Sequence, residues 1–275
     1  MRNLVILFLM VVHVQLIAQP MRVMTYNIRL NTTADGPNHW PKRMDKVFAL
    51  ILGHQPDLLG VQEAMDGQMH DLIDNLGDYA YVGVGRDDGK TAGEYSAILY
   101  RKDRFKVVEQ NTFWLSETPE VPGSKSWDAS ITRVASWAIF EDLRTEKKFL
   151  MVNTHFDHIG KEARRNSATL IQQRISKISN GLPVILSGDF NAQRDEPPFA
   201  AVTSGEFLEL YDSRPADNRQ GTYCTFSVNG PACTAIDYIF YSKGWTATGY
   251  KVVTDHNGTY YPSDHLPVLV EFTQQ

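Results

Sequence analysis

Six polar clusters in this sequence directly follow apolar runs, and together they combine carboxylates, amides and imidazoles. The clearest is LPVILSGDFNA, in which an apolar run from Leu182 ends in Asp189 and Asn191. For a single cluster, capping or turn formation is a sufficient explanation. Six of the same kind indicate that strand ends converge on one pocket. The full set is Asn27, Glu63, His155 with Asp157, Asp189 with Asn191, Asp237, and Asp264 with His265.

Carboxylates gathered in one pocket would repel one another unless a cation neutralised them. Oxygen ligands suit a hard ion such as Mg²⁺ or Mn²⁺, and zinc is disfavoured because no Cys-x-x-Cys or His-Glu-x-x-His spacing is present. A hard metal beside imidazoles and a carboxylate base fits the hydrolysis of a phosphate ester. The chain has neither a Walker Gly-rich loop nor a Gly-x-Ser-x-Gly elbow, which disfavours nucleotide-driven and serine-hydrolase chemistry.

The spacing of apolar residues predicts the elements that position these clusters. Two segments have helical spacing, Lys42 to Leu52 and Ala163 to Ile178. Many strands with few helices at irregular intervals predict packed mixed sheets covered by helices. The strand candidates, mostly rich in β-branched and aromatic residues, are Arg22 to Arg29, Leu58 to Gln62, Ser96 to Tyr100, Ala135 to Phe140, Phe149 to Thr154, Val184 to Leu186, Tyr238 to Tyr241 and Val268 to Phe272.

The second predicted helix has a basic polar face. We interpret this face as solvated, and a phosphate-binding strip is the alternative. Its members are Arg164, Arg165, Arg174 and Lys177.

The first 18 residues have the architecture of a signal peptide, with Arg2, an apolar run from Leu4 to Ile17, and then Ala18. A membrane anchor needs roughly 20 apolar residues, and this run is shorter and contains His13. We therefore expect cleavage after Ala18 and export to the periplasm or outside the cell. Residues 19–275 are expected to form one domain and a monomer without a membrane anchor.

The net charge and the cysteines set two further limits. The formal net charge of −5 becomes about −6 once Arg2 is removed (−5 minus +1), which opposes a surface that coats nucleic acid non-specifically. Cys224 and Cys233 flank the turn signal Asn229-Gly230-Pro231. A disulfide between them would stabilise an exported protein by roughly 2 to 3 kcal/mol. Two free buried thiols are the alternative, and strand register decides between them.

Seven motifs occur in the order seen in one large enzyme family. They are TYNIR, VQE, YSAILYR, NTHFDH, GDFNA, IDYIF and SDH, and the match around them extends from Arg22 to Phe272. The sequence thus resembles the endonuclease/exonuclease/phosphatase superfamily, which includes pancreatic-type deoxyribonuclease, abasic-site endonucleases, neutral sphingomyelinases and deadenylases. The resemblance implies an α/β fold, a four-layer α/β/β/α sandwich. Two mixed, mostly antiparallel β-sheets would lie face to face with helices outside and the active site at one edge.

The resemblance also implies roles for the matching residues. Glu63 would be the principal metal ligand with Asn27 beside it, and Asp264 a metal or orienting carboxylate. Asp189 would orient or deprotonate the attacking water, and Asn191 would donate to the transition state.

Further roles follow from the same resemblance. His265 would bind phosphate, and His155 would be a second imidazole that assists the leaving group and is oriented by Asp237. Glu94 matches an acidic residue of the deoxyribonuclease branch, and Arg133 would be a phosphate clamp. The remaining candidates for substrate binding are Asn153 and Trp127; Trp127, like Trp114, would either stack on a base, sugar or headgroup or pack in the interior.

Two segments, FWLSETP (113–119) and GSKSWDAS (123–130), resemble a bacterial branch of the family that is often exported. One departure is Ala235, where many relatives have Arg two residues before the Asp of IDYIF.

The sequence therefore favours a secreted Mg²⁺- or Mn²⁺-dependent phosphoesterase, most of all a phosphodiesterase. Its substrate partner would be nucleic acid, a nucleotide or a lipid headgroup. A phosphomonoesterase of the same fold is an alternative. A non-catalytic protein that binds a phosphate ligand is another, which the retained set of site residues disfavours. An unrelated adhesion-type β-sandwich is disfavoured by the two helices and the His-containing strand ends.

Overall fold

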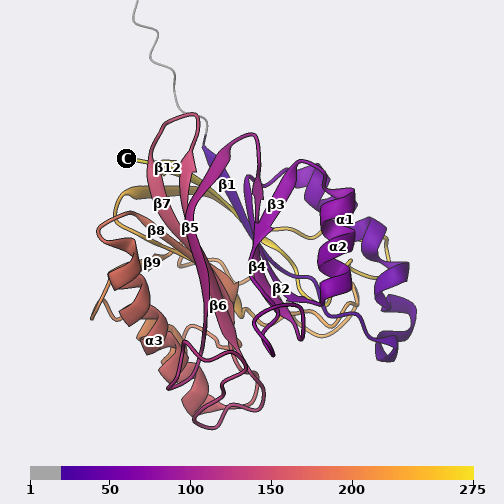
Figure 1. Ribbon diagram of the computed structural model, residues 1–275. Helices are drawn as coiled ribbons and strands as arrows, with labels where there is room; N and C mark the ends of the chain where they lie inside the picture. The colour runs from indigo at the N-terminus through magenta and orange to yellow at the C-terminus, as the bar shows by residue number, and fades with distance from the viewer. Residues whose placement is uncertain (1–19) are drawn as a thin grey trace, which may run out of the picture.

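The computed structural model describes residues 20–275, so the predicted signal peptide, residues 1–18, lies outside the described part. Two six-stranded sheets pack face to face, with helices on both outer sides (Figure 1). Helices α1 (Met44–His54) and α2 (Asp66–Asn75) cover the first sheet, and α3 (Lys161–Ser179) and the short α4 (Pro197–Val202) cover the second. The predicted four-layer sandwich is therefore confirmed.

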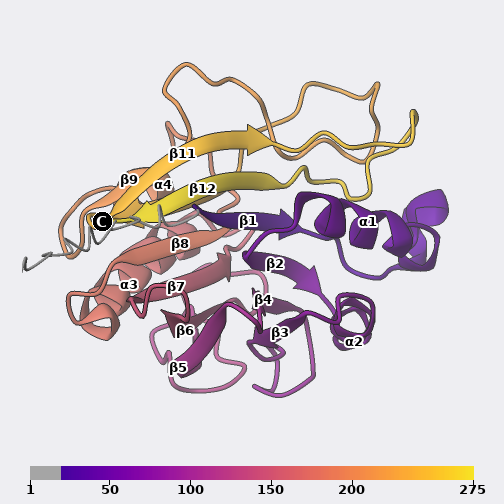
Figure 2. The same ribbon diagram turned by 90° about the horizontal axis from the view of Figure 1, so that it is seen from above.

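The first sheet has the strand order β11-β12-β1-β2-β4-β3. Its strands β1 and β2 are parallel, and its other neighbours are antiparallel. Figure 2 shows β11, β12 and β1 side by side in this sheet. The strands are β1 (Met21–Asn27), β2 (Leu58–Ala64), β3 (Tyr79–Val82), β4 (Tyr95–Arg101), β11 (Trp245–Val252) and β12 (Val268–Gln274).

The second sheet has the order β5-β6-β7-β8-β10-β9. Here β7 and β8 are the parallel pair, so the sheet is again mixed and mostly antiparallel. The strands are β5 (Phe105–Trp114), β6 (Val134–Asp142), β7 (Lys148–His155), β8 (Val184–Asp189), β9 (Leu210–Asp212) and β10 (Asp237–Ser242).

Successive side chains of the inner strands bury themselves in different layers of the core. In β1, Val23 faces the opposite sheet, whereas Met24 faces the helices; in β2, Leu58 and Leu59 divide in the same way. This follows from the two-residue period of a strand. Because both faces are covered, these strands read as continuous apolar runs that end abruptly in polar residues.

All eight predicted strands and both predicted helices are present, but several elements have no clear pattern in the sequence. The edge strand β5 is exposed along its middle, so it carries no regular apolar period. The helix α2 is mostly polar, and only Gln68, Met69 and Leu72 are buried. Elements with one weakly buried face leave a weak signal.

The polar face of α3 is only partly solvated, which corrects the interpretation of its four cations. Arg164 is buried, and its Nη1 donates to the carbonyl oxygen of Asp157 at 3.0 Å. Arg174 packs over the Phe113 ring and pairs with Glu120. The long side chains of a basic helix can bury their stems while the charged ends find partners.

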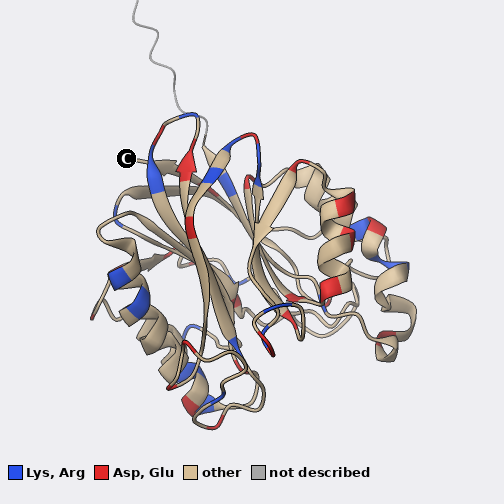
Figure 3. Ribbon diagram, in the orientation of Figure 1, with Lys and Arg blue, Asp and Glu red and all other residues tan. Residues whose placement is uncertain are grey.

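The two outer layers carry different charged residues, with Asp and Glu on α2 and Lys and Arg along α3 (Figure 3). Within residues 20–275, none of the helices is both long and apolar enough to span a membrane.

Candidate active site

A cavity of about 460 Å³ lies at the edge of the sandwich where several strands end. Asn27, His155 and Asp189 are the last residues of β1, β7 and β8, and Glu63 is the last but one of β2. The pairs β1–β2 and β7–β8 are parallel, so their polar ends meet at one edge. The cavity is lined by Arg29, Leu30, Glu63, Glu94, Ile131, Arg133, His155, His158, Asp189, Asn191, Tyr223, Ile236, Asp264 and His265.

Asp189 lies at the centre of the polar groups. Its Oδ2 accepts a hydrogen bond from Asn27 Nδ2 at 3.0 Å and lies 3.4 Å from His155 Nε2 and 3.7 Å from His265 Nε2. Its Oδ1 accepts from the backbone N–H of Asn191 at 2.9 Å. Burial, together with the charge of Asp237, raises the pKa of Asp189 to about 7. A carboxylate with this pKa is suited to take a proton from water near neutral pH.

His265 is held as a cation by the carboxylates around it. Its Nδ1 lies 2.9 Å from Asp237 Oδ2. Burial alone would lower the pKa of this imidazole, but Asp237 and Asp189 outweigh that effect and raise the pKa well above its ordinary value. The expectation that Asp237 orients His155 is therefore wrong. The antiparallel register places Asp237 opposite Asp189, and Asp237 Oδ2 contacts His265 Nδ1.

For His155, in contrast to His265, the surroundings disfavour the charged form of the imidazole. Its Nε2 lies 3.1 Å from Asn191 Nδ2, but its Nδ1 has no hydrogen-bond partner among the described residues and lies 4.0 Å from Glu94 Oε2. Burial lowers its pKa well below the ordinary value, and the charges of Arg133 and Arg86 lower it further. His155 is consequently neutral at physiological pH.

Glu63 and Asp264 supply oxygen atoms on another wall of the cavity. Glu63 has φ 63°, a strained backbone conformation for a residue other than glycine. Its Oε1 accepts from Asn27 Nδ2 at 3.0 Å, and its Oε2 accepts from the N–H of Leu30 at 3.1 Å. The guanidinium of Arg29 lies 3.6 Å from Glu63 and 3.9 Å from Asp264, at a place where positive charge is favoured.

These donors fit a hard divalent cation, because carboxylate and amide oxygens are the ligands that Mg²⁺ and Mn²⁺ prefer. A second group, Asp189, Asp237 and His265, offers ligand atoms within 4.8 Å of one another. In that group Asp237 and His265 are already hydrogen-bonded to each other. Glu63 and Asp264 both line the cavity, whereas Asp237 does not, so they are better placed to hold a metal.

A family model described as "Endonuclease/Exonuclease/phosphatase family" matches residues 24–265. The chain belongs to this family. Two solved bacterial structures of the family are similar to it. The endonuclease/exonuclease/phosphatase from Bacteroides vulgatus is 38% identical, over 93% of this chain and 99% of that one, with a TM-score of 0.88. The mannosyl-6-phosphatase from Bacteroides thetaiotaomicron is 39% identical, over 92% and 99%, with a TM-score of 0.85.

A more distant relative by sequence is mouse nocturnin. It is 23% identical over 92% of this chain, which spans 66% of nocturnin's length. Relatives in the family are nucleases and phosphatases, and its enzymes generally depend on a divalent metal. The protein is accordingly a hydrolase that acts on phosphate esters, as the sequence predicted.

Two of the predicted substrate-binding residues lie away from the cavity. Asn153 is fully buried, and its Nδ2 donates to the carbonyl oxygens of Val61 and Ala97 in the opposite sheet at 2.8 and 2.9 Å. It lies two residues before His155 on the same inward face of β7, but deeper between the sheets. Trp127 is half-buried and does not line the cavity. The interior-packing alternative holds for Trp114, whose Nε1 donates to the Arg86 carbonyl oxygen.

Asp157 also lies outside the cavity lining, although it belongs to the NTHFDH motif. It accepts hydrogen bonds from the backbone of Ser130, Ile131, Ile159 and Gly160. Although burial acts in the opposite direction, these bonds lower its pKa to about 2. Asp157 therefore fixes the loop that carries one wall of the cavity.

Three polar residues of the cavity were not among the predicted site residues. Arg29 and His158 belong to the motifs TYNIR and NTHFDH, so the motifs were a usable signal for them. Tyr223 follows no apolar run, and its ring lies 5.0 Å from that of His265. It reaches the site from the long loop before β10, which carries no sequence pattern.

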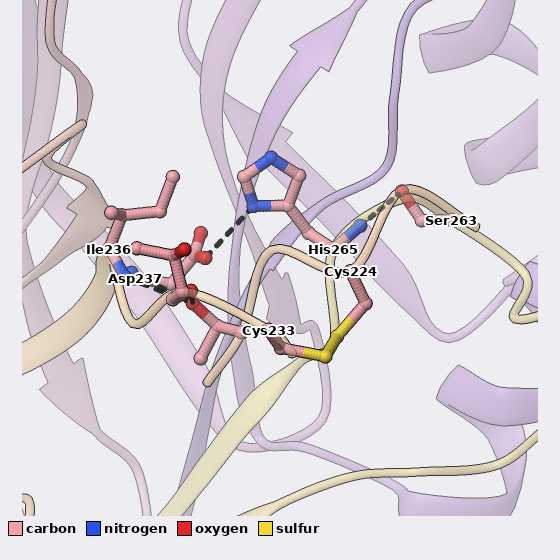
Figure 4. Close-up of a disulfide and its surroundings, with 8 residues drawn as sticks. Cys224, Cys233, Ile236, Asp237, Ser263 and His265 are labelled. Atoms are coloured by element: carbon pink, nitrogen blue, oxygen red, sulfur yellow. Dashed lines mark hydrogen bonds and ion pairs between the residues drawn. A yellow bond between two sulfur atoms is a disulfide. The ribbon is translucent and has the colours of Figure 1, made fainter. Parts of the chain in front are cut away.

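Cys224 and Cys233 form a disulfide in that loop (Figure 4), so the alternative of two free thiols is wrong. Beside it, Thr222 Oγ1 accepts hydrogen bonds from the backbone N–H groups of Ile236 and Asp237 at 3.1 and 3.2 Å. The N–H of Cys224 donates to the carbonyl oxygen of Asp264 at 2.7 Å. The disulfide loop thus holds the two segments that carry Asp237 and His265.

Proposed function

We propose that this protein is an exported, Mg²⁺- or Mn²⁺-dependent phosphatase that hydrolyses the phosphate ester of a small, hydroxyl-rich compound. The observation that carries the proposal is the arrangement around Asp189, where a carboxylate with a pKa of about 7 lies between two imidazoles in opposite charge states. A base next to fixed donors is what an attacking water and a phosphoryl group require.

The proposed substrate differs from the phosphodiester that the sequence favoured. A cavity of about 460 Å³ suits a phosphate with a group of sugar size better than a nucleic-acid duplex. The net charge of −5 opposes a polyanionic substrate. The 39% identical Bacteroides thetaiotaomicron protein, described as a mannosyl-6-phosphatase, supports a sugar phosphate.

Each residue around Asp189 has a separate task in the proposed reaction. Asp189 takes the proton of the attacking water, and the hydrogen bonds that it accepts from Asn27 Nδ2 and the backbone N–H of Asn191 hold its carboxylate in position. The cationic His265 attracts the negative charge of the phosphate, and the neutral His155 accepts a hydrogen bond from Asn191 Nδ2 and fixes that side chain. Glu63 and Asp264 hold the divalent cation, which supplies Lewis-acid stabilisation of the phosphoryl oxygens when bound.

Export is supported by two independent features. The first 18 residues have the composition of a signal peptide. The chain also contains a disulfide between its only two cysteines, and disulfides persist mainly in oxidising compartments. Fractionation of producing cells tests this proposal, which is wrong if the uncleaved chain stays in the cytosol.

The enzymatic proposal is tested by assaying residues 19–275 on hexose 6-phosphates, bis-p-nitrophenyl phosphate, plasmid DNA, RNA and sphingomyelin, with Mg²⁺, Mn²⁺ or EDTA. We expect phosphate release from the monoesters, loss of activity in EDTA, and a rate about 10³-fold lower for Asp189→Asn. Asp103→Asn, which changes an exposed carboxylate paired with Arg101, is the matched control. Faster cleavage of a diester would overturn the substrate assignment, and no cleavage of any ester would overturn the activity.

A further inference from the structure

Arg133 carries hydrogen-bond donors without partners although its side chain is almost completely buried. The residue is 5% exposed, and neither Nε nor Nη1 has a partner among the described residues. Its Nη2 lies 3.2 Å from His158 Nδ1, which fixes the direction of the guanidinium. Buried donors are rarely left unpaired, because each one loses its hydration without compensation. Since Arg133 lines the cavity, a ligand group can pair with these donors.

Glu94 lies opposite these donors and is itself held in place. Its two carboxylate oxygens accept from the Arg86 guanidinium at 2.7 and 2.8 Å. Its Oε2 lies 3.9 Å from Arg133 Nη1 and 4.0 Å from His155 Nδ1. Both distances exceed a hydrogen bond, and within residues 20–275 neither Arg133 Nη1 nor His155 Nδ1 has another partner. A single oxygen atom about 2.8 Å from Arg133 Nη1 and from Glu94 Oε2 would bridge these two atoms.

We call the space between Arg133 Nη1 and Glu94 Oε2 the gap, and the two side chains that border it determine which chemical group can bind there. Arg133 can only donate, whereas the two Glu94 oxygens, which both accept from the Arg86 guanidinium, act as acceptors. A hydroxyl group accepts from the first and donates to the second. An oxygen of a phosphate or carboxylate has no proton to donate, and it would meet the negative charge of Glu94 directly.

The gap lies beside the reaction centre. His155 turns Nε2 toward Asp189 and Asn191, at 3.4 and 3.1 Å, and turns Nδ1 toward Glu94, whose Oε2 lies 3.9 Å from Arg133 Nη1. The imidazole ring therefore separates Arg133 from the carboxylate that activates water. A group bound at Arg133 belongs to the part of the substrate beyond the phosphate.

From this geometry we propose that Arg133 and Glu94, with His158 as a positioning residue, bind a hydroxyl group of the alcohol portion of the substrate. This subsite makes the enzyme selective for phosphate esters of polyols and sugars. The assignment replaces the phosphate-clamp role expected for Arg133 from the sequence. It rests on the proposed phosphatase function.

The first experiment compares two substrates with wild-type enzyme and Arg133→Met. A hexose 6-phosphate carries hydroxyl groups on its leaving group, whereas p-nitrophenyl phosphate carries none. We expect the variant to lose about 10- to 100-fold in kcat/KM on the sugar phosphate, the loss typical of a charged hydrogen bond. On p-nitrophenyl phosphate it should lose less than about threefold. Equal losses on both substrates would show that Arg133 acts on the phosphate or on folding, and would overturn the subsite.

The second experiment removes the hydroxyl group from the substrate. Monodeoxy hexose 6-phosphates are assayed with wild-type enzyme and with Arg133→Met. One position should lower the wild-type kcat/KM about 10-fold or more but have little further effect in the variant, because both changes remove the same contact. If every position has the same effect in both enzymes, a water molecule fills the gap and the proposal is wrong.

Because Arg133 is buried, Arg133→Met could lose activity by misfolding, so a second variant changes an exposed residue of the same subsite. His158 is exposed and contacts Arg133 through Nδ1. His158→Ala should raise KM for the sugar phosphate by about threefold to tenfold and raise KM for p-nitrophenyl phosphate by a smaller factor. Arg101→Met, at a strand end paired with Asp103, is the matched arginine control and should change neither substrate. If wild-type enzyme cleaves p-nitrophenyl phosphate but no sugar phosphate, the subsite fails while the phosphatase activity stands; if it cleaves neither, the proposed function itself fails.

Discussion

The two imidazoles of the site face the same carboxylate but have different surroundings on their other side. Nδ1 of His265 lies 2.9 Å from Asp237, whereas Nδ1 of His155 lies 4.0 Å from Glu94. The pKa of His265 is raised well above its ordinary value, and the pKa of His155 is lowered well below it. One imidazole is therefore a cation and the other is neutral at the same pH.

The difference comes from the second carboxylate and not from depth, since both rings are buried. Asp237 is free to stabilise a charge on His265. Glu94 is engaged by Arg86, and Arg133 adds positive charge on the same side as His155. The charge state of each histidine is thus set by the residue that faces its Nδ1.

The largest expected effect comes from removing each imidazole in turn. His265→Gln should lower kcat by about 10³-fold or more, because a buried cation that stabilises phosphate charge is lost. His155→Gln should cost about 10²-fold, since the glutamine amide oxygen can still accept the hydrogen bond from Asn191 in place of a neutral imidazole. Steady-state kinetics on one substrate measures both losses.

Equal losses of kcat for His265→Gln and His155→Gln would contradict the assignment of different charge states to the two imidazoles. His70→Gln is the matched control, because His70 is exposed on α2 and lies outside the cavity lining.

A smaller effect is expected from the carboxylates behind the rings. Asp237→Asn should lower kcat by about 10²-fold, since His265 loses the charge that keeps it protonated. Glu94→Gln should cost less, about 10-fold, because its carboxylate lies too far from His155 to hold it directly. A larger loss for Glu94→Gln would show that His155 depends on a carboxylate as His265 does.

The pH profile distinguishes these charge states. Asp189 must lose its proton to act as a base, so kcat/KM should rise about tenfold per pH unit up to about pH 7, the pKa of Asp189. The profile should fall again only well above neutrality, where His265 loses its proton. Asp237→Asn lowers both pKa values, because the Asp237 charge raises both, and the whole profile should move to lower pH. A saturating divalent cation moves the acidic limb the same way. An unmoved profile in the variant would contradict the assignment of His265 as the cation.

Much of the site could be predicted because its residues end buried strands. Asp189 and His155 end apolar runs that are covered on both faces, and the parallel pair β7–β8 brings these two ends to one edge. The same pattern does not show whether a polar side chain reaches the cavity or stays buried between the two sheets. Asn153 has the residue type and face of a site residue, but it lies between the sheets and bonds to Val61 and Ala97.

The partner of each imidazole could not be predicted, because it depends on strand register. Asp237 begins β10, and only the antiparallel pairing with β8 places it beside His265. Residues from loops were missed for a related reason. Tyr223 reaches the cavity from an irregular segment, where no periodicity marks which side chain points inward.

The smallest effect on activity is expected from the disulfide, which supports only one of the two imidazoles. The Cys224–Cys233 loop contacts the segments of Asp237 and Asp264 through Thr222 and Cys224. Replacing both cysteines by serine should lower the free energy of unfolding by about 2 to 3 kcal/mol, the value for a loop of this length. It should lower kcat only severalfold, because the hydrogen bonds of Thr222 remain. Chemical denaturation and kinetics measure the two quantities.

Coupling between variants shows whether the disulfide acts through His265. The double serine variant should combine additively with His155→Gln, since the two changes share no contact. With Asp237→Asn its effect on kcat should be less than additive, because both changes release the same imidazole. Because Cys233 is partly exposed, a reducing agent should reproduce the loss in the wild-type enzyme. Additive behaviour in both pairs would mean that the loop stabilises the fold without positioning His265, and the two halves of the site would then differ only in their charges.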